Sequence, residues 1–312
     1  MERREMCKMG KALEIAHNVW LGPTPDTSFS TSEDQWPVNF DIYIEANDLS
    51  TPPDPQTLRR IGEESYSSPQ AMDFPSSGSI LPQPWPHSEK DPLTRMCHWM
   101  NKLASRDQKP DRGEEDLAPD ADGDIPMRNL APSGRKILLH CTDGYTETTL
   151  LAVAYLMFAE QLPVHEAWLR MHREKKRNFF AYPSDVALLQ SLESRLVFTR
   201  HTQDKRGRKQ SIPQAPAWLS RMDGSLPSRI LPYLYLGNLG HANNPELLKE
   251  IGISQILSIG EPVNWMPPRS HVGAKDINVL FVDRIQDNGV DPLTGEIERC
   301  LGYIGKQLVC LK

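Results

Sequence analysis

Hydrophobic residues in the middle of the chain form short, dense runs that predict buried elements. The run KILLH at 136–140 follows a turn-forming Pro-Ser-Gly and is typical of a strand buried on both faces of a parallel sheet. The longer run LLAVAYLMFA at 150–159 is apolar on every side and predicts a buried helix. The pattern predicts helices over 148–161, 163–177 and 184–197, the last capped by Ser184 after Pro183. A strand, a loop and then helices is an α/β order.

A second set of core positions begins near residue 230. YLYL at 233–236 predicts a strand that ends at Gly237. In NNPELLKEIG, Asn244 is the predicted cap of a helix that has Pro245 at its first position. Two more strands are predicted over 253–259 and 278–283.

Long polar stretches divide these elements. Residues 46–90 are rich in Pro, Ser and Asp, and residues 105–134 are charged and broken by Pro and Gly, so both are predicted to be low-complexity insertions. A third polar stretch, 200–216, is the best candidate for a boundary between two domains. The predicted organisation is a first domain at 1–200, a linker at 201–224 and a second domain at 225–312.

Two short sequences occur twice, in the same order. NVWLGPTPD (18–26) resembles YLYLGNLGH (233–241), and DPLTRMCHWMNKL (91–103) resembles DPLTGEIERCLGYI (291–304). Two matches in one order favour an internal duplication. The second copy would then stop before reaching the segment that corresponds to KILLH and the residues after it.

Composition excludes several classes of function. The net charge is -6 and no long basic block occurs, so no nucleic-acid partner is expected. The longest apolar run, 150–159, is too short for a bilayer, which needs about 20 residues, so no membrane partner is expected. MERREMCKMG lacks the apolar core of a secretory signal, and the five cysteines are scattered, which favours a cytoplasmic or nuclear protein with reduced thiols.

The candidate chemistry lies in HCTDGYTET, residues 140–148. A cysteine that attacks phosphorus needs a lowered thiol pKa, a cradle of backbone N–H groups and a cation. A Cys at a strand end, followed by a glycine turn and a helix N-terminus, supplies the first two. The cation is normally an Arg at the sixth residue after the Cys, and here that residue is Glu147. A carboxylate there repels a phosphate by about 4 kcal/mol per charge pair, and Asp143 adds to the repulsion.

His140, Cys141, Gly144 and Thr148, between an apolar strand and an apolar helix, resemble the loop of the protein tyrosine and dual-specificity phosphatases. The tandem pattern is similar to fungal dual-specificity phosphatases associated with S phase. The resemblance implies an α/β fold with a mainly parallel central sheet flanked by helices, in two tandem copies of which the second is incomplete. It also implies dephosphorylation of phosphoproteins through a phosphocysteine, with no cofactor and no metal.

The same resemblance assigns residues to the two copies. In the second copy it places Asp287 at the general-acid position, with Asp291 as a competitor, whereas the matching residue of the first copy is His87. No copy therefore holds Cys, Arg and Asp together.

Two interpretations of the chain stay open. In the first, the chain is a weakly active or inactive phosphatase whose substrate is a phosphorylated protein. In the second, it is a pseudophosphatase module that binds a protein partner. A zinc site built from Cys97, His98, His140 and Cys141 fits no compact ligand spacing, so no metal site is expected.

Overall fold

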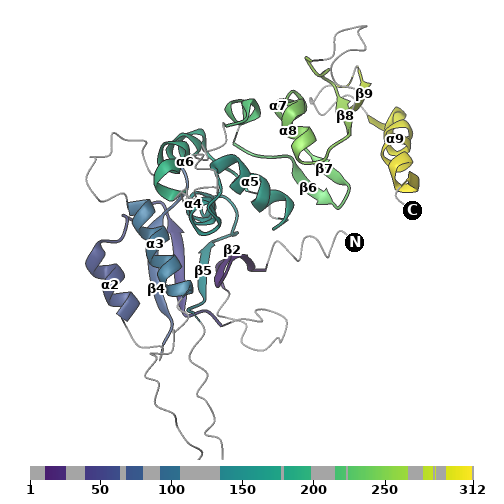
Figure 1. Cartoon of the computed structure of the whole chain (residues 1–312). Helices are drawn as coiled ribbons and strands as arrows, with labels where there is room; N and C mark the ends of the chain where they lie inside the picture. The colour runs from purple at the N-terminus through teal and green to yellow at the C-terminus, as the bar shows by residue number, and fades with distance from the viewer. Residues whose placement is uncertain are drawn as a thin grey trace, which may run out of the picture.

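The computed structural model describes residues 11–25, 39–63, 68–79, 92–105, 134–176, 179–197, 215–222, 224–265, 277–283, 285 and 293–310. Its centre is a five-stranded sheet (Figure 1) with the order β1-β2-β5-β3-β4. The strands are β1 (Leu13–Ala16), β2 (Val19–Pro23), β3 (Ile42–Asn47), β4 (Gln70–Pro75) and β5 (Ile137–Cys141). β1 and β2 are antiparallel, and all other neighbours are parallel. The mainly parallel α/β sheet is confirmed.

β5 is the middle strand and the most buried one. All five of its residues are buried, because β2 and β3 pair with its two edges in parallel and helices cover the sheet. Ile137 lies opposite Val19 on one side and Ile42 on the other. The strand predicted at 136–140 is confirmed with a shift of one residue. Its last residue, Cys141, consequently leaves the sheet at the carboxyl edge of the parallel strands.

α4 (Thr149–Glu160) is the buried helix that the apolar run predicts. Ten of its residues, from Thr149 to Phe158, are buried, because the helix contacts α3 (Pro92–Ala104), α5 (Val164–Arg173), α6 (Pro183–Leu196) and β1. The three helices predicted at 148–161, 163–177 and 184–197 are confirmed as α4, α5 and α6. The cap of the last is corrected: Tyr182 is the N-cap and Pro183 occupies the first turn, where its missing N–H costs nothing.

The prediction that 46–90 is a low-complexity insertion is wrong for two stretches, 55–63 and 70–75. Residues 55–63 form α2 (Pro55–Glu63), which buries only Leu58 and Ile61, and residues 70–75 form the edge strand β4. Pro, Ser and Asp dominate the composition of this segment, and its few apolar residues fall on single narrow faces. The segment 106–133 and the residues 80–90 lie outside the described part of the chain, so the prediction for 105–134 stays a prediction there.

The second half contains smaller elements. These are β6 (Ser228–Leu231), β7 (Leu234–Leu236), α7 (Leu239–Ala242), α8 (Pro245–Glu250), β8 (Gln255–Ile259), β9 (Asn278–Val282) and α9 (Ile297–Cys310), with 3-10 turns at Ala217–Arg221 and Leu293–Gly295. Of these, β7, α8, β8 and β9 correspond to the predicted strands and helix. Asn244 is the N-cap of α8 as predicted, but its side chain donates to the Trp218 carbonyl at 3.1 Å instead of capping the helix. Trp218 is only 2% exposed, so the end of the predicted linker is packed rather than free.

The first hairpin of each half, β1–β2 in one and β6–β7 in the other, has the same register. In β1–β2 the pairs are Leu13–Leu21, Glu14–Trp20 and Ala16–Val19, and in β6–β7 they are Ser228–Leu236, Arg229–Tyr235 and Leu231–Leu234. Each hairpin has one register shift, and it falls at the corresponding place. The next strands are also alike, since β3–β4 and β8–β9 are both parallel pairs.

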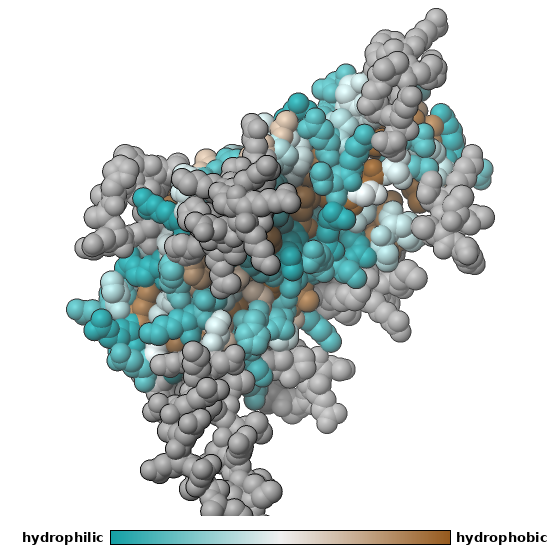
Figure 2. Space-filling view, in the orientation of Figure 1, coloured by the Kyte–Doolittle hydropathy of each residue, from teal (hydrophilic) through white to brown (hydrophobic). Residues whose placement is uncertain are grey.

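The halves differ in the central strand. Among the described residues, β6–β7 and β8–β9 are separate two-stranded sheets, with no counterpart of β5 between them. Leu21 is 2% exposed beside β5, whereas Leu236, at the same hairpin position, is 68% exposed. Figure 2 shows hydrophobic surface among hydrophilic residues in the region of β6 to α9.

Of the helices in the described residues, none is long and apolar enough to cross a membrane.

Candidate functional site

The loop between β5 and α4 has the layout that the sequence predicts. Cys141 ends the strand, Gly144 lies in the left-handed region at φ 66°, and α4 begins at Thr149. A Cβ at Gly144 would come within 2.2 Å of the Gly22 carbonyl carbon, so the residue must be glycine on two grounds. The loop thus packs directly against the end of β2, where the Thr24 N–H donates to the Cys141 carbonyl at 2.8 Å.

His140 lies beneath this loop as a structural residue. It is 5% exposed, and its Nδ1 lies 3.0 Å from the Thr24 Oγ1. The Tyr43 ring meets the imidazole edge to face. Burial lowers the pKa of His140 below its ordinary value, which keeps the ring neutral at pH 7. It therefore links β5 to the segment after β2 and brings no positive charge to the cysteine.

The Cys141 thiol has the opposite of a nucleophile's properties. It is 2% exposed, and its Sγ donates to the Asp143 Oδ1 at 3.4 Å. Burial, followed by the neighbouring carboxylate of Glu147, raises the pKa of the thiol to about 11. A thiolate nucleophile needs a lowered pKa, so Cys141 is protonated at neutral pH.

The Asp143 carboxylate accepts hydrogen bonds from donors of the loop that a bound oxyanion would need. Its Oδ1 accepts the Tyr145 N–H at 2.8 Å in addition to the Cys141 thiol. The Gly144 N–H donates to the Cys141 carbonyl at 3.2 Å. The loop's own carboxylate therefore stands where a cradle would present donors to a phosphoryl group.

Glu147 is held in place by a loop that follows β4. Its carbonyl accepts the Ser77 N–H at 2.8 Å and the Ser77 hydroxyl at 3.1 Å. The same hydroxyl accepts the Leu150 N–H at 2.8 Å. The Oε2 atom of the Glu147 carboxylate is buried and has no hydrogen-bond partner. The next residue, Thr148, is 2% exposed, and its Oγ1 also has no hydrogen-bond partner. These two buried oxygens are unsatisfied in a loop that is otherwise well fixed.

No protein-family model matches the chain. A search of curated proteins finds the dual specificity protein phosphatase PPS1 of Saccharomyces cerevisiae, which is 32% identical over 311 aligned positions. The chain is homologous to a dual-specificity phosphatase. The alignment covers 70% of this chain and 38% of the yeast protein, so the chain spans well under half the length of that relative.

Solved structures give a looser likeness. The active form of Tk-PTP is 16% identical, with a TM-score of 0.36, over 59% of this chain and 97% of that chain. Human DUSP28 is 14% identical, with a TM-score of 0.32, over 59% of this chain and 94% of that chain. The α/β fold of this chain follows from its own strand order and register.

The structure brings five of the six predicted site residues into one loop, namely His140, Cys141, Gly144, Glu147 and Thr148. The sixth, Asp287, lies outside the described residues, as do its competitor Asp291 and the first-copy counterpart His87.

Sequence reasoning missed Ser77 and Asp185. The carboxylate of Asp185, on the first turn of α6, accepts the Gly78 N–H with both oxygens at 3.1 and 3.0 Å. Burial raises the pKa of Asp185 to about 6. Both residues position the β4 loop that holds Glu147. The only available signal was the Ser-Ser-Gly sequence at 76–78, inside the segment predicted to be low in complexity.

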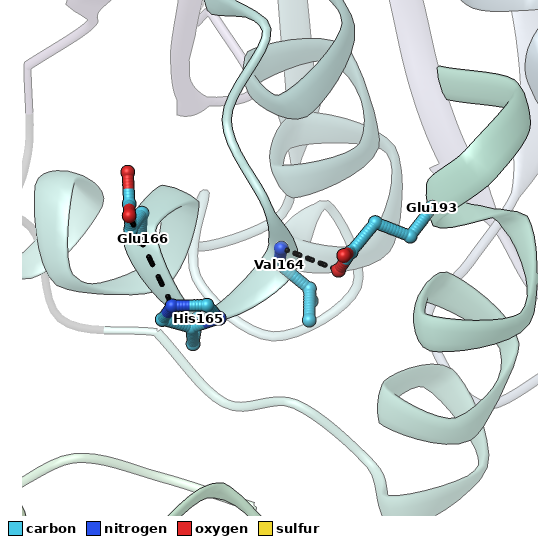
Figure 3. Close-up of polar contacts among 4 residues, drawn as sticks. All are labelled: Val164, His165, Glu166 and Glu193. Carbon is cyan, nitrogen blue, oxygen red and sulfur yellow. Dashed lines mark hydrogen bonds and ion pairs between the residues drawn. The ribbon is translucent and has the colours of Figure 1, made fainter. Parts of the chain in front are cut away.

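A second group of polar contacts, at the start of α5, is structural (Figure 3). The Val164 N–H donates to the Glu193 Oε2 at 3.0 Å, which satisfies a free donor of the first helical turn. The His165 Nε2 lies 4.0 Å from the Glu166 Oε1. Burial lowers the pKa of His165, so the pair is not ionic at pH 7. This group fixes helix ends and offers no reacting atom.

The pH profile of alkylation tests the state of Cys141. We expect the rate of carbamidomethylation by iodoacetamide, followed at the Cys141 peptide by mass spectrometry, to rise about tenfold per pH unit from pH 7 to 10, because only the thiolate reacts. Glu147→Gln is expected to shift the profile to lower pH, since it removes the charge beside the thiol. The buried Cys97, read in the same digest, is the internal control. A plateau below pH 8 in the parent chain would contradict the raised pKa.

Proposed function

We propose that this chain is a member of the dual-specificity phosphatase family whose Cys141 loop does not hydrolyse phosphate esters. Homology to the yeast phosphatase and the strand–loop–helix frame around Cys141 support the family. The observation that carries the loss of activity is the carboxylate of Glu147 at the position where the chemistry needs a guanidinium. The protonated, buried thiol points the same way.

The proposal includes two tandem copies, with a first domain at 1–200, a linker at 201–224 and a second domain at 225–312. The identical registers of β1–β2 and β6–β7, each with one shift at the same place, support a duplication. In the second copy, Asp287 is the proposed general acid. A complete second copy would need a strand equivalent to β5, followed by a loop that bears both Cys and Arg.

Assay of a generic aryl phosphate tests the proposed loss of activity. We expect purified 1–312 to hydrolyse p-nitrophenyl phosphate no faster than its Cys141→Ser variant, at any pH between 5 and 8. Cys141→Ser removes the nucleophile with little change of volume, so it sets the background rate. Turnover by the parent chain that Cys141→Ser abolishes would overturn the proposal.

A second candidate function is a pseudophosphatase module that binds a protein partner. The observation that favours it is the distribution of exposed hydrophobic residues. Six of the eight large exposed ones in the described residues belong to the second half: Ile230, Tyr233, Leu236, Ile259, Ile297 and Leu301. Exposed apolar surface of this kind is typical of protein contacts. The proposed partner is a phosphorylated protein or another protein, and the chain is proposed to bind it in the cytoplasm or the nucleus.

A further inference from the structure

We propose that Cys141, Asp143 and Glu147 form a binding site for a divalent transition-metal cation, with zinc as the preferred ion. The charge of this loop is inverted relative to an anion cradle. The same frame that would hold a phosphate through backbone donors and an arginine instead presents one sulfur and two carboxylates. The inference goes beyond the proposed function and does not depend on any phosphatase activity.

The distances fit a metal site. One ligand atom from each of the three residues lies within 4.8 Å of the other two, and no other group of three such donors occurs in the described part of the chain. Tetrahedral zinc, with a sulfur at about 2.3 Å and an oxygen at about 2.0 Å, separates these two atoms by roughly 3.5 Å. The Cys141 Sγ and the Asp143 Oδ1 are 3.4 Å apart. Two corners of a coordination tetrahedron are therefore already in place.

A buried oxygen of Glu147 is a second observation that favours a cation at this site. The Glu147 Oε2 is out of contact with solvent and makes no hydrogen bond, although a buried, unpaired carboxylate oxygen costs several kcal/mol in general. A cation bound between the carboxylates and the sulfur would satisfy the Glu147 oxygen and remove the repulsion between Glu147 and Asp143.

The ligand residues are held before any ion binds. Ser77 fixes the Glu147 backbone through two hydrogen bonds, and the Tyr145 N–H fixes the Asp143 carboxylate. Asp143 is exposed, so the fourth position of a tetrahedron is open to water. On binding, the thiol proton is released to solvent and sulfur becomes a thiolate ligand. One sulfur and two oxygens suit zinc or cobalt, whereas magnesium and calcium prefer oxygen alone.

Cobalt titration of the full chain tests the site. After removal of metal with a chelator, we expect one Co²⁺ per chain to bind with a thiolate-to-cobalt absorption band in the near ultraviolet, and Zn²⁺ to displace it. Cys141→Ser is expected to abolish the band, and Glu147→Gln to weaken Zn²⁺ binding at least tenfold, as measured by competition with a chromophoric chelator. Mg²⁺ at millimolar concentration should not compete.

Matched variants separate this site from others. Cys97→Ser removes another buried thiol, and Glu166→Gln removes another carboxylate, so both are expected to bind Zn²⁺ like the parent chain. Circular dichroism confirms that each variant is folded. A cobalt band that survives Cys141→Ser, or Zn²⁺ binding unaffected by Glu147→Gln in a folded protein, would overturn the proposal. So would the absence of stoichiometric binding by the parent chain. None of these results would alter the aryl phosphate assay.

Discussion

Glu147→Arg is expected to turn the 141–148 loop into an oxyanion site that binds tungstate at least about 100-fold more tightly than the parent chain. The substitution replaces a repulsive charge with an attractive one at the position of the family's arginine. At an effective dielectric of about 20, a charge pair at 4 Å contributes about 4 kcal/mol. Solvent screening of the partly exposed side chain reduces the realised gain to about 3 kcal/mol, which corresponds to roughly 100-fold in affinity.

Isothermal titration calorimetry with tungstate measures this change, and two further variants divide it into parts. Glu147→Gln removes the negative charge without adding a cation, so it should gain only about tenfold. Asp143→Asn combined with Glu147→Arg should bind most tightly, because Asp143 no longer competes for the Tyr145 N–H and the Cys141 thiol. If no variant binds tungstate, the loop is not a phosphate cradle, and the interpretation of HCTDGYTET as a phosphatase loop fails.

The sequence predicted the central elements because their signals are local. KILLH and LLAVAYLMFA are apolar on every face, which only a buried strand and a buried helix tolerate, and Gly144 fits a turn that leaves no space for a Cβ. The position of Glu147 in the loop also follows from spacing alone. These features therefore needed no knowledge of the rest of the chain.

Other features depend on contacts between distant segments and leave little local trace. α2 buries two residues, and β4 is an edge strand, so both were hidden by a composition rich in Pro and Ser. The hydrogen bonds from Ser77 to Glu147 join β4's loop to the start of α4, and no periodicity reports them. The raised pKa of Cys141 arises first from burial, which the motif does not contain. The loop was therefore predictable from the sequence, but the hydrogen bonds and the burial that hold it in place were not.

Leu21→Glu and Leu236→Glu are expected to have opposite outcomes although the two residues hold the same hairpin position. Leu21 is 2% exposed, so a glutamate there loses about 2 kcal/mol of apolar burial and forces a charge into the core. We expect the free energy of unfolding to fall by at least about 4 kcal/mol, enough to prevent stable folding of many domains. Leu236 is 68% exposed, so the same change should cost less than about 0.5 kcal/mol.

Urea unfolding followed by circular dichroism measures both variants, and Leu21→Ala with Leu236→Ala gives the same comparison without a charge. The difference arises because β5 lies beside β2, whereas no described strand lies beside β7 on that side. A large loss of stability in Leu236→Glu would mean that Leu236 is covered in solution, and sedimentation velocity would then show whether a second copy covers it. If Leu236→Glu stays folded but no longer binds a protein partner that the parent chain binds, the exposed face of the second half is the contact surface, as the pseudophosphatase function requires.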